Sequence, residues 1–279
     1  MIRIFSDSTC EFSLQRQKEL DVEVVPLSVH FGQESFRDGI DLTNEAFYAR
    51  LRTAQELPHT SQTNPEEFVE RFKPYVEQGD EIIGVFLSSQ LSGTCQSAVI
   101  AAQILGTDRV HIIDSTTVTF GLGLLVEMAA RLRDEHKTAR EIVSGLEALI
   151  PRLRLYAVVE TLKYLRMGGR ISAATAMVGG VLGVTPILNV RDGVVEAAGK
   201  SRGRKGGYQW MAKRIEAEPV DTSLPVAFAH TGAPELMAEC EAFFKPLIPG
   251  MDIREGAIGS VVGTHAGPGA TGIAYFVKE

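Results

Sequence analysis

Short apolar runs alternate with longer mixed stretches in the first half of the chain. The runs have the length of single strands, and they lie at residues 2–5, 22–29, 81–87 and 110–113. The stretches between them have the length and the starting residues of helices, and they lie at residues 64–77, 94–105 and 121–133. This alternation predicts a parallel sheet, whose functional edge is formed by the loops at the carboxyl ends of the strands.

The second half of the chain has a less regular pattern. Its strand-like runs lie at residues 155–159, 187–190, 194–197, 226–230, 257–262 and 272–277, and its helical stretches lie at residues 209–216 and 234–244. Asp192-Gly193, between two of these runs, is a strong signal for a tight hairpin turn. These elements predict a second α/β region with a mixed sheet.

One more helix is predicted at residues 138–149, and Pro151 closes it, so we place a boundary there. The sequence thus predicts an α/β protein with two lobes. Residues 1–150 hold a parallel sheet with flanking helices, and residues 151–279 hold the mixed sheet. We expect a cleft between the two lobes.

The composition excludes several classes of protein. The 279 residues include 35 acidic and 28 basic side chains, a formal net charge of −7, and 44% of the residues are hydrophobic. That hydrophobic fraction is high enough to form a core, which excludes a disordered chain, and the acidic balance disfavours nucleic-acid binding. Apolar stretches such as 118–126 and 173–184 fall short of the roughly 20 residues that span a membrane. Three scattered cysteines and an N-terminus without an apolar leader predict a cytoplasmic protein.

The sequence has no motif for metal or cofactor chemistry in a fitting context, since the GxGxxG at residues 267–272 runs into the last predicted strand with no helix after it. It contains no GxSxG or HExxH pattern, and its histidines and cysteines do not cluster at metal-ligand spacing. We therefore expect neither a bound metal nor a cofactor.

Small hydroxyl side chains gather at three places where predicted strands end or predicted helices begin. Residues 60–62 (TSQ) precede the helix at 64–77, residues 88–94 (SSQLSGT) follow one strand, and residues 114–117 (DSTT) follow the next. Hydroxyls and free backbone N–H groups at helix N-termini favour a carboxylate or a phosphate. Helix capping would explain any one cluster, because Ser and Thr are common caps. Three clusters on one sheet edge favour an anion-binding site.

Four further features bear on function if the fold brings them to that edge. Arg170 follows paired glycines and is either an anion clamp or an exposed loop arginine. His265, in the Gly- and Pro-rich stretch at 263–269, either donates a hydrogen bond or a proton to a bound anion or is polar filler. Asp7 orients a hydroxyl or, as we favour, caps a turn. The basic run at 200–205 (KSRGRK) is expected to be a solvated loop, with docking to an acidic partner or a membrane surface as the alternative.

In combination these segments resemble the DegV family, the bacterial fatty-acid-binding proteins that serve fatty-acid kinase. The likeness covers residues 2–277 as one unit. It rests on six motifs that occur in the family's order, namely Asp7-Ser8-Thr9, Thr60-Ser61-Gln62, residues 87–94, Asp114-Ser115, residues 164–171 and residues 262–269.

The resemblance implies a two-lobed protein that buries one long-chain fatty acid between its lobes. A separate ATP-dependent kinase subunit would phosphorylate the acid, and the acyl phosphate would serve phospholipid synthesis. On this interpretation the chain is a carrier and not itself an enzyme, with transient contact at a membrane surface as a further expectation. Two other classes remain open: a phosphotransferase or hydrolase that uses the same anion-binding edge, and a regulatory protein that senses a lipid.

The family's site residues carry over to matching positions. The fatty-acid carboxylate is expected at the hydroxyls of Thr60 or Ser61 and of Ser92, with Gly93 and His265 beside them, and Arg170 matches a position used at the site of phosphoryl transfer. The surrounding head-group edge is expected to include Asp7, Ser89, Thr94, Asp114, Ser115 and Thr264. The acyl tail needs a dry apolar slot, for which residues 173–184 and the helix after Phe120 are candidates.

Overall fold

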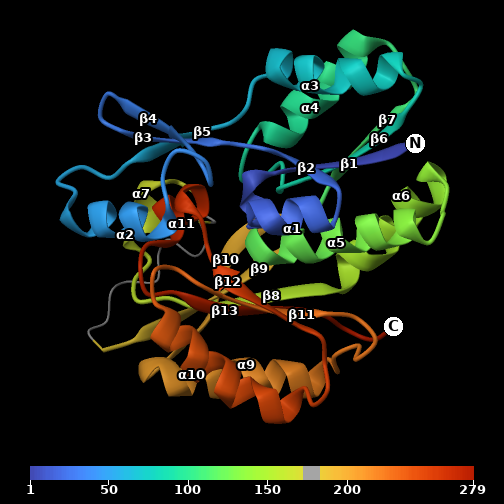
Figure 1. The fold of residues 1–279 in the computed structure, drawn as a ribbon. Coiled ribbons are helices and arrows are strands. Elements are labelled where there is room, and N and C mark those ends of the chain that lie inside the picture. The colour runs from blue at the N-terminus through green and yellow to red at the C-terminus, as the bar shows by residue number, and fades with distance from the viewer. Residues whose placement is uncertain (172–182) are drawn as a thin grey trace.

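The computed structural model describes residues 1–171 and 183–279, and within them the strands form three sheets (Figure 1). A four-stranded parallel sheet has the order β2 (Val22–Val25), β1 (Ile2–Asp7), β6 (Glu81–Phe86) and β7 (Val110–Asp114). A six-stranded sheet has the order β10 (Val194–Ser201), β9 (Thr185–Arg191), β8 (Leu153–Val158), β13 (Thr271–Phe276), β11 (Val226–His230) and β12 (Ile253–Ala257). A small antiparallel sheet has the order β4 (Glu34–Arg37), β3 (Ser28–Phe31) and β5 (His59–Ser61).

The predicted parallel sheet is confirmed, with one difference at Pro26. The apolar run at 22–29 is divided there into β2 and β3, which belong to different sheets. Proline has no backbone N–H for a sheet ladder, so a chain that crosses it changes direction easily. The helices of this half are α1 (Leu14–Glu19), α2 (Asn44–Thr53), α3 (Pro65–Glu77), α4 (Thr94–Leu105), α5 (Thr119–Asp134) and α6 (Ala139–Leu149), with a 3₁₀ turn η1 at Ser8–Cys10.

The six-stranded sheet is mixed, as predicted. Its β11–β12 pair is parallel and the others are antiparallel. The predicted hairpin joins β9 to β10 through Asp192 and Gly193, which both have positive φ. The helices of this half are α7 (Lys163–Met167), α9 (Gly203–Ala217), α10 (Pro234–Phe244) and α11 (Ser260–Ala266), with 3₁₀ turns η2 (Ile150–Arg152) and η3 (Lys245–Leu247). Figure 1 shows α9 and α10 beneath the sheet.

The strand predicted at 257–262 is wrong. β12 ends at Ala257, and α11 begins at Ser260, so His265 lies on a helix rather than in a turn between strands. Two carboxylates that are distant in sequence cap this helix. Asp38 accepts hydrogen bonds from Ser260 N at 2.8 Å and from its hydroxyl at 2.6 Å, and Glu11 accepts one from Gly259 N at 2.6 Å. No local pattern could have indicated caps supplied from more than 200 residues away.

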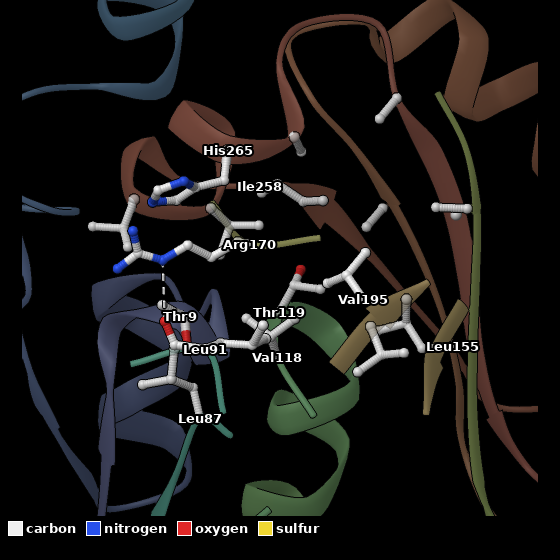
Figure 2. A pocket seen from close by; sticks show the side chains of 18 of the residues that line it. Thr9, Leu87, Leu91, Val118, Thr119, Leu155, Arg170, Val195, Ile258 and His265 are labelled. Atoms are coloured by element: carbon white, nitrogen blue, oxygen red, sulfur yellow. Dashed lines mark hydrogen bonds between the residues drawn. The ribbon is translucent and has the colours of Figure 1, made fainter. Parts of the chain in front are cut away.

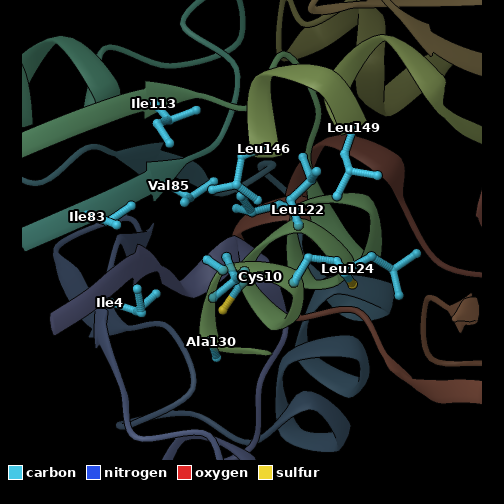
Figure 3. Packing of buried hydrophobic residues seen from close by; sticks show 14 of the residues in the cluster. Ile4, Cys10, Ile83, Val85, Ile113, Leu122, Leu124, Ala130, Leu146 and Leu149 are labelled. Carbon is cyan, nitrogen blue, oxygen red and sulfur yellow. The ribbon is translucent and has the colours of Figure 1, made fainter. Parts of the chain in front are cut away.

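Helix α5 lies between the two large sheets and holds them apart. It contacts β1 and β6 on one side and β8, β11 and β13 on the other. Its buried side chains, among them Leu122 and Leu125, join residues of both sheets in one hydrophobic cluster (Figure 3). The opposite face of the parallel sheet packs Phe5 and Phe86 against α3 and α4.

None of the helices within 1–171 and 183–279 is both long enough and apolar enough to cross a membrane.

Candidate functional site

At its centre, the six-stranded sheet carries large side chains on one face and several small ones on the other. Tyr156, Phe228 and Tyr275 alternate with small residues and pack toward α9 and α10. On the other face the small residues line a cavity, and they are Ala157, Ala227, Ala229, Gly272 and Ala274. Successive side chains of a strand point to opposite faces, so this alternation fills one side of the sheet and leaves space on the other.

The space forms an apolar cavity of about 330 Å³ between this sheet and α5 (Figure 2). Ala229, Gly272 and Ala157 are direct neighbours across β11, β13 and β8, and they form part of its floor. Its other walls come from the loop after β6, the start of α5, the β9–β10 hairpin and α11, and they include Leu87, Leu91, Val118, Val190, Val195, Ile258, Val261 and Val262.

Thr119 lines the cavity at the first residue of α5 and has a φ of +54°. A β-branched residue is strained in this left-handed region. Such strain persists only where surrounding contacts impose it, and it is concentrated at functional sites. Thr119 therefore lines the cavity in a backbone conformation that surrounding contacts must hold.

Polar side chains line one end of the cavity. Figure 2 shows His265 and Arg170 at this end and Leu155 and Val195 at the other. The Oγ1 atom of Thr60 lies 2.9 Å from Nε2 of His265, which joins β5 to α11. Arg170 donates from Nε to the carbonyl of Leu91 at 3.2 Å and from Nη1 to the carbonyl of Gly168 at 2.7 Å. An amphipathic molecule with a polar or anionic end matches this arrangement.

His265 is held in its neutral form. Burial, assisted by the charge of Arg170, lowers its pKa from 6.5 to about 4. Its Nδ1 atom is buried without a hydrogen-bond partner among the described residues. A Cβ atom at position 168 would lie 2.2 Å from that nitrogen, so Gly168 is needed for the imidazole to occupy this position.

Ser92 lies beside the N-terminus of α4. Its Oγ atom is 2.9 Å from the hydroxyl of Thr94 and accepts a hydrogen bond from Thr94 N at 3.3 Å. Gly93 is the N-cap residue and provides no side-chain cap. A Cβ atom there would lie 2.2 Å from Oε1 of Gln62, so Gly93 allows Gln62 to close over the start of the helix and donate to Ser97 at 3.1 Å. Helix N-termini favour anions, which agrees with the predicted role of this segment.

The structure separates the two candidate hydroxyls of β5. Thr60 and Ser61 are adjacent in the strand, so their side chains point to opposite faces. Ser61 borders the cavity, but its Oγ atom lies 2.9 Å from Nε2 of His30 on β3. Of the two hydroxyls, that of Thr60 is the one that reaches His265.

Asp7 caps a turn, as we favoured. It is fully buried, and its carboxylate accepts hydrogen bonds from Thr9 N at 2.9 Å, from the Thr9 hydroxyl at 2.6 Å and from Leu87 N at 2.8 Å. These contacts join the ends of β1 and β6, and Thr9 lines the cavity. Burial raises the pKa of Asp7 from 3.8 to about 6.

The remaining predicted head-group residues lie outside the cavity lining. Asp114 accepts hydrogen bonds from Ser89 N at 3.3 Å and from Thr116 N at 2.9 Å, and it thereby supports the loop after β6. Ser115 accepts one from Thr117 N at 3.2 Å, and Thr264 donates to the carbonyl of Ser260 at 2.8 Å within α11. These residues support the segments that carry the lining.

The basic run at 200–205 is divided between the end of β10 and the start of α9. Lys200, Arg202 and Lys205 are exposed. Arg204 instead hydrogen-bonds the carbonyl of Gly269 and forms an ion pair with Glu160.

Sequence reasoning did not identify the small-residue face. The alternation of Ala or Gly with large side chains along β11 and β13 was the signal that could have found it. Of the two expected tail walls, the start of α5 lines the cavity through Phe120, and residues 173–182 of the other lie outside the described residues. Within the described residues, no group of three or more His, Cys, Asp and Glu side chains is arranged to hold a metal ion.

Comparisons with known proteins find similarity over nearly the whole length of the chain. The model of the DegV family, described as uncharacterised proteins, matches residues 1–278. A DegV domain-containing protein of Caldanaerobacter subterraneus is 36% identical over 278 residues, which are 99% of each chain. One of Deinococcus radiodurans is 38% identical over 275 residues, which are 98% of this chain and 97% of that protein.

Solved structures of other proteins share the fold of this chain. A fatty-acid-binding DegV family protein from Thermus thermophilus has a TM-score of 0.90 with 30% identity over 99% of each chain. DegV from Bacillus subtilis, a fatty acid binding protein, has a TM-score of 0.87 with 29% identity over 99% of each chain. A stearic-acid-binding protein from Eubacterium ventriosum has a TM-score of 0.90 with 28% identity, covering 100% of this chain and 99% of that one.

The stability of His265→Gln relative to the wild type is expected to rise as the pH falls from 6.5 to about 4. In this window the unfolded chain binds a proton at residue 265 that the folded chain does not bind, so the wild type loses stability as the pH falls. Glutamine carries no proton in either state. Urea unfolding of both proteins across the window measures the difference.

The exposed His136 provides the control, because His136→Gln shows what the same exchange does away from the cavity. A stability difference between wild type and His265→Gln that stays constant with pH would contradict the lowered pKa.

Proposed function

The chain belongs to the DegV family, and on that basis we propose that it binds one long-chain fatty acid in the cavity. The carboxylate lies at Thr60, Ser92 and His265, and the acyl chain extends along the small-residue face of the six-stranded sheet. The observation that carries this proposal is an apolar cavity with hydroxyls, an imidazole and a guanidinium gathered at one end. The fatty acid binding described for the proteins of Thermus thermophilus and Bacillus subtilis supports it.

The energetics suit a fatty acid. Each buried methylene contributes roughly 0.8 kcal/mol, so a chain of about 16 carbons contributes on the order of 10 kcal/mol before ordering costs. The acyl chain therefore supplies the affinity and the polar end supplies the orientation. Neutral donors such as Thr60 and Ser92 suit a carboxylate that must react later, because a direct ion pair would lower its nucleophilicity.

We further propose that a separate ATP-dependent kinase subunit phosphorylates the bound acid. A carboxylate oxygen attacks the γ-phosphorus of ATP, the bond from that phosphorus to the bridging oxygen of ADP breaks, and acyl phosphate and ADP result. This chain acts as the carrier, and Arg170 lies beside the carboxyl end, where negative charge develops during the transfer. The exposed basic side chains at 200–205 are available for brief contact with an anionic membrane surface.

Mass spectrometry of an organic extract from the purified, denatured protein is the first test. We expect close to one fatty acid per chain, with an acyl profile that defines the preferred length. If the extract is empty, defined fatty acids are offered to the protein. An empty extract followed by no binding would refute the proposed function.

Replacing Thr60 or Ser92 with alanine is expected to weaken fatty-acid binding. Each loses one hydrogen bond to the carboxylate, about 1 kcal/mol or roughly fivefold in affinity, and the double variant loses more. Titration with a fluorescent fatty acid measures the dissociation constants. Ser89→Ala is the matched control, because that exposed serine lies in the same loop outside the cavity lining. Unchanged affinity in both single variants and the double variant would show that these hydroxyls do not hold the carboxylate.

Arg170→Ala is expected to retain the fatty acid and to lose phosphorylation by the cognate kinase. The measurements are fatty-acid affinity and acyl-phosphate formation with the kinase and ATP. Because Arg170 also hydrogen-bonds Leu91 and Gly168, the thermal midpoint of the variant is measured alongside. Arg170→Lys, which retains a positive charge, is expected to recover part of the turnover. Normal turnover in Arg170→Ala would leave this residue a structural role only.

A further inference from the structure

A second pocket lies beyond the end of the cavity that is remote from His265. Figure 2 shows Leu155 at that end, and Leu155 and Val190 line both spaces. The second pocket, here called the fork pocket, has a volume of about 290 Å³. The backbone pairing of β8 with β9 covers Tyr156–Val158 and Ile187–Asn189, and the fork pocket lies where that pairing has ended. Leu155 and Val190 therefore form a boundary between the two spaces.

Leu155 is a large side chain next to the small residues of the cavity floor. Ala157, two residues along β8 and on the same face, belongs to that floor. In the other direction the next residue on this face is Leu153, which pairs with Phe276, so the floor of small residues does not continue there. A Cβ atom on Gly121 of α5 would lie 3.2 Å from Cδ1 of Leu155. The Leu155 side chain thus reaches from the sheet to α5 and closes the end of the cavity between them.

The fork pocket is lined largely by polar and charged side chains. Arg154 and Glu218 form an ion pair there, with 2.6 Å between Nη2 and Oε1. The Oδ1 atom of Asn189 is buried and has no hydrogen-bond partner among residues 1–171 and 183–279. The other polar residues of the lining are Ser115, Thr116, Thr117, Arg191 and Asp192. The methyl end of an acyl chain in this pocket would keep water from these groups without bonding to them, which is unfavourable.

We propose that Leu155 is a specificity-determining residue that sets the greatest length of acyl chain the cavity accepts, an inference that rests on the proposed function. With the carboxylate beside His265, the methyl end of the acid points toward Leu155. Up to this side chain, each methylene is buried among apolar residues of the cavity. Beyond it, a longer chain meets the polar fork pocket, so further methylenes add no affinity.

The test measures the dissociation constants of saturated fatty acids, from laurate to docosanoate, for the wild type and for Leu155→Ala. We expect the affinity of the wild type to rise roughly fourfold with each methylene up to a limiting length and to stop rising beyond it. Leu155→Ala should extend that length by about two to three carbons, the space that the lost side-chain atoms leave, and should bind an acid about two carbons beyond the wild-type limit roughly tenfold more tightly. Leu155→Phe, with a larger side chain, should shorten the limiting length.

Leu153→Ala is the matched control, since Leu153 lies on the same face of β8 and lines the fork pocket but not the cavity. It should leave the limiting length unchanged. Leu155→Val, which is expected to extend the limit by about one carbon, provides the result if the alanine variant does not fold.

A wild type whose limiting length is unchanged in the Leu155 variants would overturn this inference and leave the proposed function standing. A wild type without any limiting length between laurate and docosanoate would do the same. A wild type that binds none of these acids would overturn both.

Discussion

A hollow that the protein's own side chains do not fill is the constraint on which this structure depends. Small residues on β8, β11 and β13 face α5 across a gap, and α5 contacts both large sheets and keeps them apart. Apolar side chains around such a hollow lose packing partners, so the stability must come from close packing elsewhere in the core. The aromatic clusters around Phe5, Phe86 and Phe244, on the far faces of the two sheets, supply that packing.

The polar end of the cavity depends on three carboxylates that do not line the cavity themselves. Asp7 fixes the ends of β1 and β6 to each other, and Glu11 and Asp38 fix the start of α11. Burial raises the pKa of each of these three carboxyl groups, which means that the folded protein carries their charge at a cost. The hydrogen bonds from backbone N–H groups offset part of that cost, because an ionised acceptor makes stronger bonds than a neutral one. Their effect reaches the site through geometry, since the position of α11 decides whether His265 meets Thr60.

The sequence predicted the elements that neighbouring residues determine, and it missed the features that distant contacts determine. The helix at 94–105 and the helix that begins after Asn64 carry their start signals within a few residues, and both are confirmed. Two hydroxyl clusters follow parallel strands as predicted, but the third is wrong, because residues 60–62 begin within β5 of the small antiparallel sheet. Residues 114–117 follow β7, the edge strand, whereas the cavity lies at the ends of the central strands β1 and β6. Strand order cannot be read from local patterns. Helix α11 was missed for a related reason, because its caps come from Glu11 and Asp38.

On the proposed function, the two ends of the cavity favour one orientation of the fatty acid. A reversed ligand would bring its carboxylate among the apolar side chains of Ala157, Leu155 and Val195, away from Thr60, Ser92 and His265, and burying an unpaired charge there is costly. It would also leave the hydroxyls of Thr60 and Ser92 facing methylene groups. Neutral His265 strengthens this asymmetry, since it adds hydrogen-bonding capacity at the polar end. The tail end needs no polar group at all, so the small residues there can serve the single purpose of leaving room. Different parts of the chain thus determine the orientation of the ligand and the space available to it. The polar residues of β5, α11 and the loop after β6 determine its orientation, and the small residues of β8, β11 and β13 leave the space that it occupies.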